Sequence, residues 1–225
     1  MQVGGSQYQV PAGRRDGNVS LAGDTNGNLP PPTANVNQLN QIFGSKGLDQ
    51  RDMVALSGEN STPSSNIPSV HLKNVVADLG CFAHTQSAGA HTVGSAQCSS
   101  FDSRLYSYGP NAGGQDPSMD PAYLATLTTQ CPQAGAPAGT LVAMDPVTPN
   151  SFDTNYYANI VANRGLLASD QALLADNTTL QQVTGYTTSP DTFQADFAAA
   201  MVKMGAIGVL TGTSGSIRTD CKVAN

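Results

Sequence analysis

The chain has 225 residues, and its 39% hydrophobic content is enough for one buried core of domain size. With 10 Lys and Arg against 16 Asp and Glu, its net charge of −6 argues against nucleic acid or an anionic membrane as a partner. No apolar run approaches the roughly 20 residues of a membrane span, and the first residues lack the basic start and apolar stretch of a signal peptide. We therefore expect a globular protein, without nucleic-acid or membrane partners and with no export signal in this chain.

The first part of the chain predicts a long loop followed by two helices. Residues 13–33 are dense in Gly, Asn and Pro, which favours an irregular loop over any regular element. Apolar residues then recur at helical spacing over residues 36–43, which predicts an amphipathic helix. Asp49 can cap a second helix that ends at Gly58.

Three further helices are expected in the second half of the chain. An Asp-Pro pair at Asp120 marks the start of a helix that reaches Cys131. Another runs from about residue 153 to residue 163, and the last has Ser189 as its cap and a buried side that includes Phe193. No alternating strand pattern competes, so the predicted fold class is mainly α, with long irregular connections.

The four cysteines, at positions 81, 98, 131 and 221, leave two interpretations open. They form no CxxC pair and have no histidines at zinc-finger spacing, so a zinc site is not expected. A disulfide between Cys98 and Cys131 could close the turn-rich segment between them in an oxidising compartment. Four buried reduced thiols are the alternative on count alone.

Six segments of this chain, in order, resemble class III (secretory plant) haem peroxidases. They are VPAGRRDG (10–17), RDMVALSG (51–58), AHTVGSAQC (90–98), DPVTPNSFDTNYY (145–157), LLASDQALL (166–174) and IRTDCKVAN (217–225). The resemblance implies a mainly helical fold that holds haem b between a distal and a proximal layer of helices. It makes His91 the axial ligand of the haem iron, and Asp170 the acceptor for the other imidazole nitrogen.

Such a pair suits peroxidase chemistry. An imidazole whose N–H is bonded to a buried carboxylate donates more strongly to iron, which helps to stabilise its oxidised forms. On local pattern alone, His91 would more often be a core histidine with satisfied hydrogen bonds. The family resemblance reverses that preference.

The resemblance also implies a Ca²⁺ site next to the iron ligand. Its oxygen ligands would come from Thr92, Asp145, Thr148, Ser151 and Asp153, the kind of donors that a hard cation prefers. In an isolated segment, Asp145 and Asp153 would instead be interpreted as turn or cap residues.

Two further roles follow from the same resemblance. It pairs Cys98 with Cys131 in a disulfide, and it places Pro30 at the edge where aromatic donors approach the haem. The family partner of Cys221 would lie upstream of Met1, so Cys221 is expected to be free or mispaired with Cys81.

The chain departs from the family pattern at two places. It starts where the family has already supplied its distal helices, with the R-x-x-F-H motif that cleaves peroxide by acid–base catalysis. Residues 59–89 have no counterpart, and we interpret them as translated intron. The expected organisation is therefore a single, partial haem peroxidase domain over residues 1–225, interrupted by the insertion at 59–89.

The function implied by the resemblance is one-electron oxidation of phenolic or other aromatic donors by hydrogen peroxide, which also removes the peroxide. The alternative is a catalytically impaired remnant or mis-spliced product that binds calcium or haem without turnover. The resemblance further implies a secreted, extracellular monomer.

Overall fold

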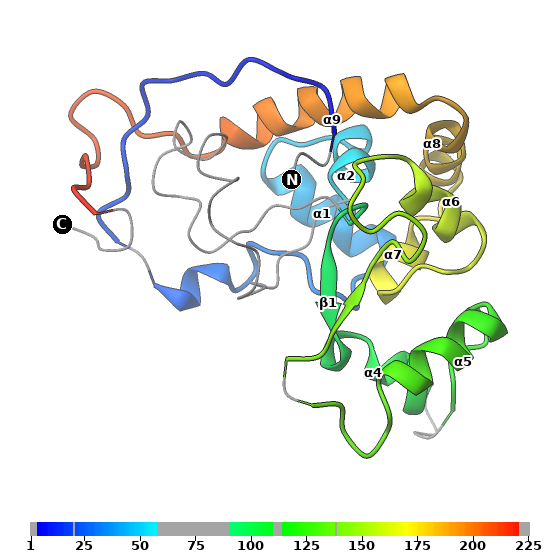
Figure 1. The fold of residues 1–225 in the computed structure, drawn as a ribbon. Helices are drawn as coiled ribbons and strands as arrows, with labels where there is room; N and C mark the ends of the chain where they lie inside the picture. Colours follow the sequence, from blue (N-terminus) through cyan, green and yellow to red (C-terminus); the bar gives the residue numbers. More distant parts are fainter. Residues whose placement is uncertain (1–3, 20, 58–90, 110–113, 138, 221–225) are drawn as a thin grey trace.

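The computed structural model describes residues 4–19, 21–57, 91–109, 114–137 and 139–220, and within them the protein is mostly helical (Figure 1). The predictions for residues 59–89 and for Cys81 and Cys221 lie outside these ranges. Within them, no helix is long and apolar enough to cross a membrane.

The two helices expected early in the chain are present. Helix α1 spans Val36–Ser45, and Asn35 caps it by accepting a hydrogen bond from the backbone N–H of Gln38, at 3.0 Å. Helix α2 spans Gln50–Leu56 and begins in the same way, with Asp49 accepting from the N–H of Asp52 at 2.9 Å. The described part of the loop before them is mostly irregular, as expected. It also contains a 3₁₀ turn, η1 (Ala22–Thr25), and antiparallel bridges from Arg15 to Leu210 and from Asp16 to Ser216, which the composition did not predict.

Helix α9 (Pro190–Gly205) crosses the top of the molecule and packs along α2 (Figure 1). Its expected start at Pro190 is confirmed, but Ser189 makes no side-chain capping bond. The backbone carbonyl of Ser189 accepts from the N–H groups of Thr192 and Phe193 instead. The cap role predicted for the Ser189 hydroxyl is therefore wrong, because the backbone alone closes this turn.

Helices α6 (Asn155–Val161), α7 (Ala168–Ala172) and α8 (Asn177–Thr188) complete the upper part of the molecule. The sequence predicted α6, but we did not predict α7 or α8. Five of the 12 residues of α8 are threonine, and threonine forms helices weakly. Its burial of Thr179, Val183 and Tyr186 against other helices compensates for that weak propensity.

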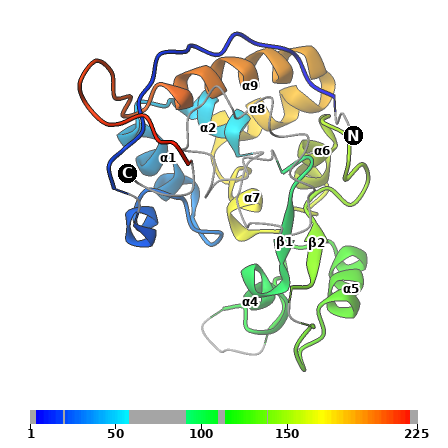
Figure 2. The ribbon, with the colours of Figure 1, turned by 60° about the vertical axis from the view of Figure 1, so that its left-hand side comes forward.

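A smaller lower part is built on a two-stranded antiparallel sheet, which corrects the expectation that no strands would form. Strand β1 (Ser95–Gln97) pairs with β2 (Leu141–Ala143), with Ala96 opposite Val142. The turn η3 (Cys98–Ser100) and the helices α4 (Asp102–Tyr106) and α5 (Pro121–Gln130) follow β1 and lie below the strands (Figure 2). Strands of three residues are too short to show an alternating pattern.

The described residues form two hydrophobic clusters. The aromatic core joins α1, α2, α6, α8 and α9, and its largest side chains are Tyr156, Tyr157, Tyr186 and Phe193. The disulfide core joins the strands, α4 and α5, and it includes the disulfide between Cys98 and Cys131 that the resemblance implied. Leu166 and Leu167, directly before α7, belong to the disulfide core.

Candidate functional site

His91 and Asp170 meet in the interior, although 79 positions separate them in the chain. The Nδ1 atom of His91 lies 2.9 Å from Oδ1 of Asp170, and the two residues are only 2% and 1% exposed. Because a carboxylate only accepts hydrogen bonds, this contact puts a proton on Nδ1. In the neutral ring, the Nε2 atom then carries the free lone pair.

The carboxylate of Asp170 is held by two more donors. Its Oδ2 accepts from the backbone N–H of Leu167 at 2.8 Å, which closes the first turn of α7. Its Oδ1 also accepts from the hydroxyl of Tyr156 at 3.0 Å. Burial, followed by the charge of Asp170, raises the pKa of Tyr156 well above its ordinary value, so this phenol stays a donor. These contacts fix the orientation of the carboxylate toward His91.

Arg104 supports the segment that carries Asp170. Its buried guanidinium donates to the carboxylate of Asp116 at 2.8 Å. It also donates to the backbone carbonyls of Gly165, Leu166 and Leu167, at 2.6, 2.9 and 3.0 Å. Arg104 thereby ties α4 to the residues that immediately precede α7. We did not predict this role, because one arginine in the segment DSRLY has no local pattern that indicates it.

The Nε2 atom of His91 is buried and has no hydrogen-bond partner among the residues that the structure describes. An unpartnered polar atom in the interior is costly, so its presence needs a reason. The imidazole also borders a pocket with apolar and small polar walls, formed by Pro30, Leu39, Phe43, Ser57, Ser169, Asp170 and His91 itself. The site thus offers one buried imidazole nitrogen, without a partner in the described part of the chain, beside the apolar side chains of Pro30, Leu39 and Phe43. Such a nitrogen is the kind of donor that haem iron takes.

The ring of Tyr156 completes the surroundings of His91. It lies edge-on to the imidazole, with ring centroids 5.4 Å apart and an angle of 83° between the planes. Its hydroxyl also donates to the backbone carbonyl of Ser57, at 3.0 Å. Tyr156 therefore contacts both members of the His91–Asp170 pair. The helical spacing placed it on a buried face but did not reveal this contact.

The five residues expected to bind calcium lie close together next to His91. The hydroxyl of Thr92 donates to the backbone carbonyls of Ser151 and Asp153, at 3.2 and 2.9 Å. The hydroxyl of Thr148 donates to Asp145 at 3.0 Å. Asn155 joins these two groups, because it bonds to both Asp153 and Thr148.

Asp145 is fully buried, and its carboxylate accepts four hydrogen bonds, from Val147, from both the backbone and the hydroxyl of Thr148, and from Asn159. In the described part of the chain, no Lys, Arg or His side chain is within ion-pair distance of it. The same part contains no group of three or more His, Cys, Asp or Glu side chains placed to hold a metal. Hydroxyl and backbone oxygens would have to provide most ligands for a cation here.

This combination of a mostly helical fold with a buried His–Asp pair is accompanied by a sequence match to the family model "Peroxidase" over residues 1–189. The chain belongs to the peroxidase family, and its relatives are plant class III peroxidases. It is 45% identical to Peroxidase 5 of Vitis vinifera over 223 residues, which are 99% of this chain and 58% of that protein.

Two other relatives match over a comparable share of their length, at lower identity. The chain is 39% identical to Peroxidase 3 of Arabidopsis thaliana, over 99% of this chain and 59% of that protein. It is 41% identical to a basic peroxidase of Zinnia elegans, over 97% of this chain and 56% of that protein. The chain therefore spans a little under three-fifths of the length of these relatives.

Proposed function

We propose that this chain binds haem b through Nε2 of His91 and takes part in the oxidation of phenolic donors by hydrogen peroxide. The observation that carries the proposal is the buried Nε2 atom, which has no hydrogen-bond partner among the described residues while Nδ1 is bonded to Asp170. Membership of the peroxidase family supports the same assignment. When bound, haem would supply the iron that reacts with peroxide and accepts electrons one at a time.

The protein's own contribution begins with Asp170. By accepting the N–H of His91, its carboxylate makes the imidazole a stronger electron donor and fixes the direction of Nε2. The hydroxyl of Tyr156 shares the same carboxylate oxygen and moderates that effect. Leu39, Phe43 and Pro30 would supply apolar contact to the porphyrin, and Pro30 would also meet the aromatic donor at the pocket edge.

We also propose a Ca²⁺ site formed by Thr92, Asp145, Thr148, Ser151 and Asp153. The buried carboxylate of Asp145 supports it, because within the described ranges that charge meets hydrogen-bond donors and no cationic side chain, and a bound cation would neutralise it. Thr92 is covalently next to His91, so calcium would stabilise the backbone that carries the iron ligand.

The second candidate is a chain that binds haem or calcium with little turnover. It is supported by the sequence, in which the other two histidines, His71 and His84, lie in the segment 59–89 that we interpret as an insertion. An acid–base histidine on the peroxide side is what such catalysis requires. For both candidates we propose a monomeric, extracellular protein with one partial domain over residues 1–225, interrupted at 59–89.

Haem reconstitution tests the proposal. We expect a Soret band that is lost in His91→Ala but kept in the matched control His84→Ala. A band that survives in His91→Ala contradicts the assignment of the ligand. Guaiacol oxidation above that of free haem then supports the enzyme, whereas a Soret band without such turnover supports the second candidate.

Calorimetric titration with CaCl₂ tests the calcium site separately. Binding should be lost in Asp145→Asn and retained in Asp102→Asn, which removes an exposed carboxylate of α4. Equal binding by the two variants rejects the site.

A further inference from the structure

A chain of three tyrosine rings leads away from His91 through the aromatic core. The ring of Tyr156 lies edge-on to His91, the ring of Tyr157 lies 5.0 Å from that of Tyr156, and the ring of Tyr186 lies 5.0 Å from that of Tyr157. All three residues are buried, and the neighbouring pairs are in edge-to-face contact. The rings thus form a continuous path from the site to helix α8.

These tyrosines are the side chains in this core that lose an electron most readily. The sequence contains no tryptophan. Phe193 packs against both Tyr157 and Tyr186, but a benzene ring without a hydroxyl is much harder to oxidise. An electron that leaves the aromatic core therefore comes from a tyrosine.

The three phenols differ in where their protons can go. The hydroxyl of Tyr157 donates to the backbone carbonyls of Val54 and Ala55, which are not bases and cannot take its proton. The hydroxyl of Tyr186 donates to the carboxylate of Asp196 at 2.7 Å, and it accepts from the side-chain amide of Gln182, also at 2.7 Å. A phenol that loses an electron becomes a strong acid, so only a ring with a nearby base can stabilise the resulting radical. Tyr156 also bonds to a carboxylate, that of Asp170, but this carboxylate is 1% exposed and already accepts from His91, so the contact gives the phenolic proton no route to solvent.

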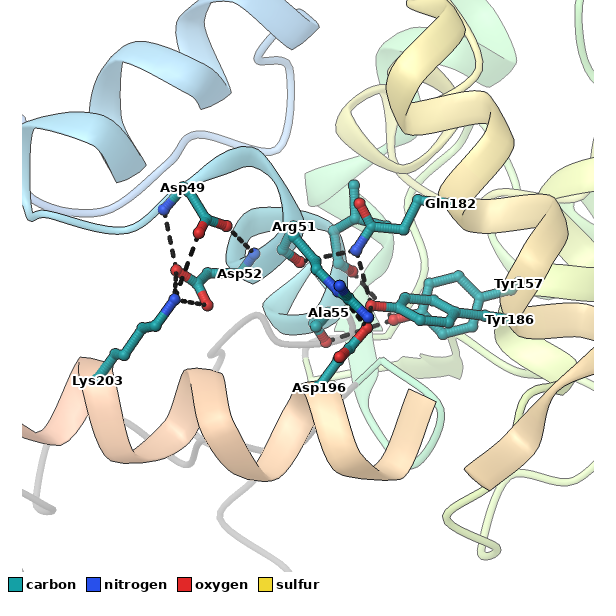
Figure 3. Close-up of polar contacts among 10 residues, drawn as sticks. Asp49, Arg51, Asp52, Ala55, Tyr157, Gln182, Tyr186, Asp196 and Lys203 are labelled. Carbon is teal, nitrogen blue, oxygen red and sulfur yellow. Dashed lines mark hydrogen bonds and ion pairs between the residues drawn. The ribbon is translucent and has the colours of Figure 1, made fainter. Parts of the chain in front are cut away.

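At the far end of the path, Asp196 bonds to both Tyr186 and Arg51 (Figure 3). The guanidinium of Arg51 donates to the same oxygen of Asp196 at 2.7 Å, and the Arg51 and Asp196 side chains are 63% and 16% exposed. Asp196 can therefore pass a proton to solvent, whereas the Tyr157 hydroxyl is enclosed between α2 and α6.

We propose that Tyr156, Tyr157 and Tyr186 carry oxidising equivalents away from the haem pocket, and that the radical comes to rest on Tyr186. The inference depends on the proposed function, since the oxidant is haem that hydrogen peroxide has oxidised. One electron passes from Tyr186 through Tyr157 and Tyr156 and reduces the haem by one equivalent. The phenolic proton of Tyr186 moves to Asp196, and no bond between heavy atoms forms or breaks. The path protects the haem pocket when no donor is present.

The test uses haem-loaded protein mixed with hydrogen peroxide without a donor and frozen for electron paramagnetic resonance. We expect a tyrosyl radical signal that Tyr186→Phe removes. The matched control Tyr123→Phe, which changes a buried tyrosine of the disulfide core, should keep the signal. Phenylalanine keeps the ring packing, and circular dichroism checks that both variants are folded.

The remaining outcomes separate this inference from the proposed function. A Soret band that responds to peroxide, with a radical signal unchanged in Tyr186→Phe or no radical at all, overturns the tyrosine path and leaves haem binding intact. Absence of a Soret band, or a band that peroxide does not alter, overturns both. Faster bleaching of the haem by excess peroxide in Tyr186→Phe than in Tyr123→Phe supports the protective role.

Discussion

The aromatic core and the disulfide core are stabilised in different ways. In the aromatic core, five helices interlock bulky rings, and α2 is joined to α9 by the ion pairs Arg51–Asp196 and Lys203–Asp52 (Figure 3). The disulfide core has two short strands and small helices, and it relies on one covalent link and on the buried guanidinium of Arg104. We therefore expect the aromatic core to depend mainly on its buried apolar area, and the disulfide core to depend on its disulfide and on Arg104.

The His91–Asp170 pair lies where the two cores meet. Asp170 accepts from the backbone of Leu167, which belongs to the disulfide core, and from Tyr156, which belongs to the aromatic core. A substitution that loosens either core should therefore disturb the contact between His91 and Asp170. Four experiments on the linkages test this comparison.

The largest effect is expected from Arg104→Met. It leaves the Asp116 carboxylate and three backbone carbonyls without their buried donor, which should lower the free energy of unfolding by about 3–5 kcal/mol. Denaturant unfolding measures this loss. A loss below about 1 kcal/mol would show that the disulfide core does not depend on Arg104.

The next largest effect is expected from replacing Cys98 and Cys131 by serine. They are 33 residues apart, and from the chain entropy of a loop of that length we expect the free energy of unfolding to fall by about 3–4 kcal/mol. Hydrogen exchange should accelerate in α4 and α5 and change little in α8 and α9. Equal acceleration in both cores contradicts their separation.

A smaller loss of stability is expected when the pH is lowered and Asp116 becomes protonated. Burial raises the pKa of Asp116, but hydrogen bonds from Ser118 and Arg104 outweigh it and hold that pKa below its ordinary value of 3.8. Because the folded pKa is the lower one, this carboxylate stabilises the fold above pH 3.8, and the contribution is lost as pH falls through the folded pKa. Asp116→Asn should unfold with a weaker dependence on pH below 3.8 than the parent chain. If the variant and the parent chain depend on pH in the same way, Asp116 is not the group responsible.

The smallest effect is expected from Arg51→Met in the aromatic core. The Arg51–Asp196 pair is partly exposed, so its loss should cost about 0.5 kcal/mol or less in thermal unfolding. The matched variant Lys203→Met should cost more, because it leaves the nearly buried carboxylate of Asp52 without its cation. If Arg51→Met instead cost more than Lys203→Met, burial of the carboxylate would not be what makes these ion pairs differ in strength.

The sequence predicted elements whose signals are local. Asp49, Asp120 and Pro190 each marked a helix start that the structure contains, because capping depends on residues within one turn. Helix α8 and the two strands were missed, since their stability comes from burial against distant segments. The ordered family segments identified the family and singled out His91 and Asp170, but they could not show how far apart these two side chains lie.

The amino-acid sequence by itself determined the helix starts, the family and the types of residue available for chemistry. Only the tertiary structure brought His91, Asp170 and Tyr156 into contact, fixed the support from Arg104, and aligned three tyrosine rings in one core. The physical reason is the distance along the chain over which each interaction acts. Capping and helix propensity act over a few residues, whereas the orientation of a buried carboxylate depends on donors that lie far apart in the chain.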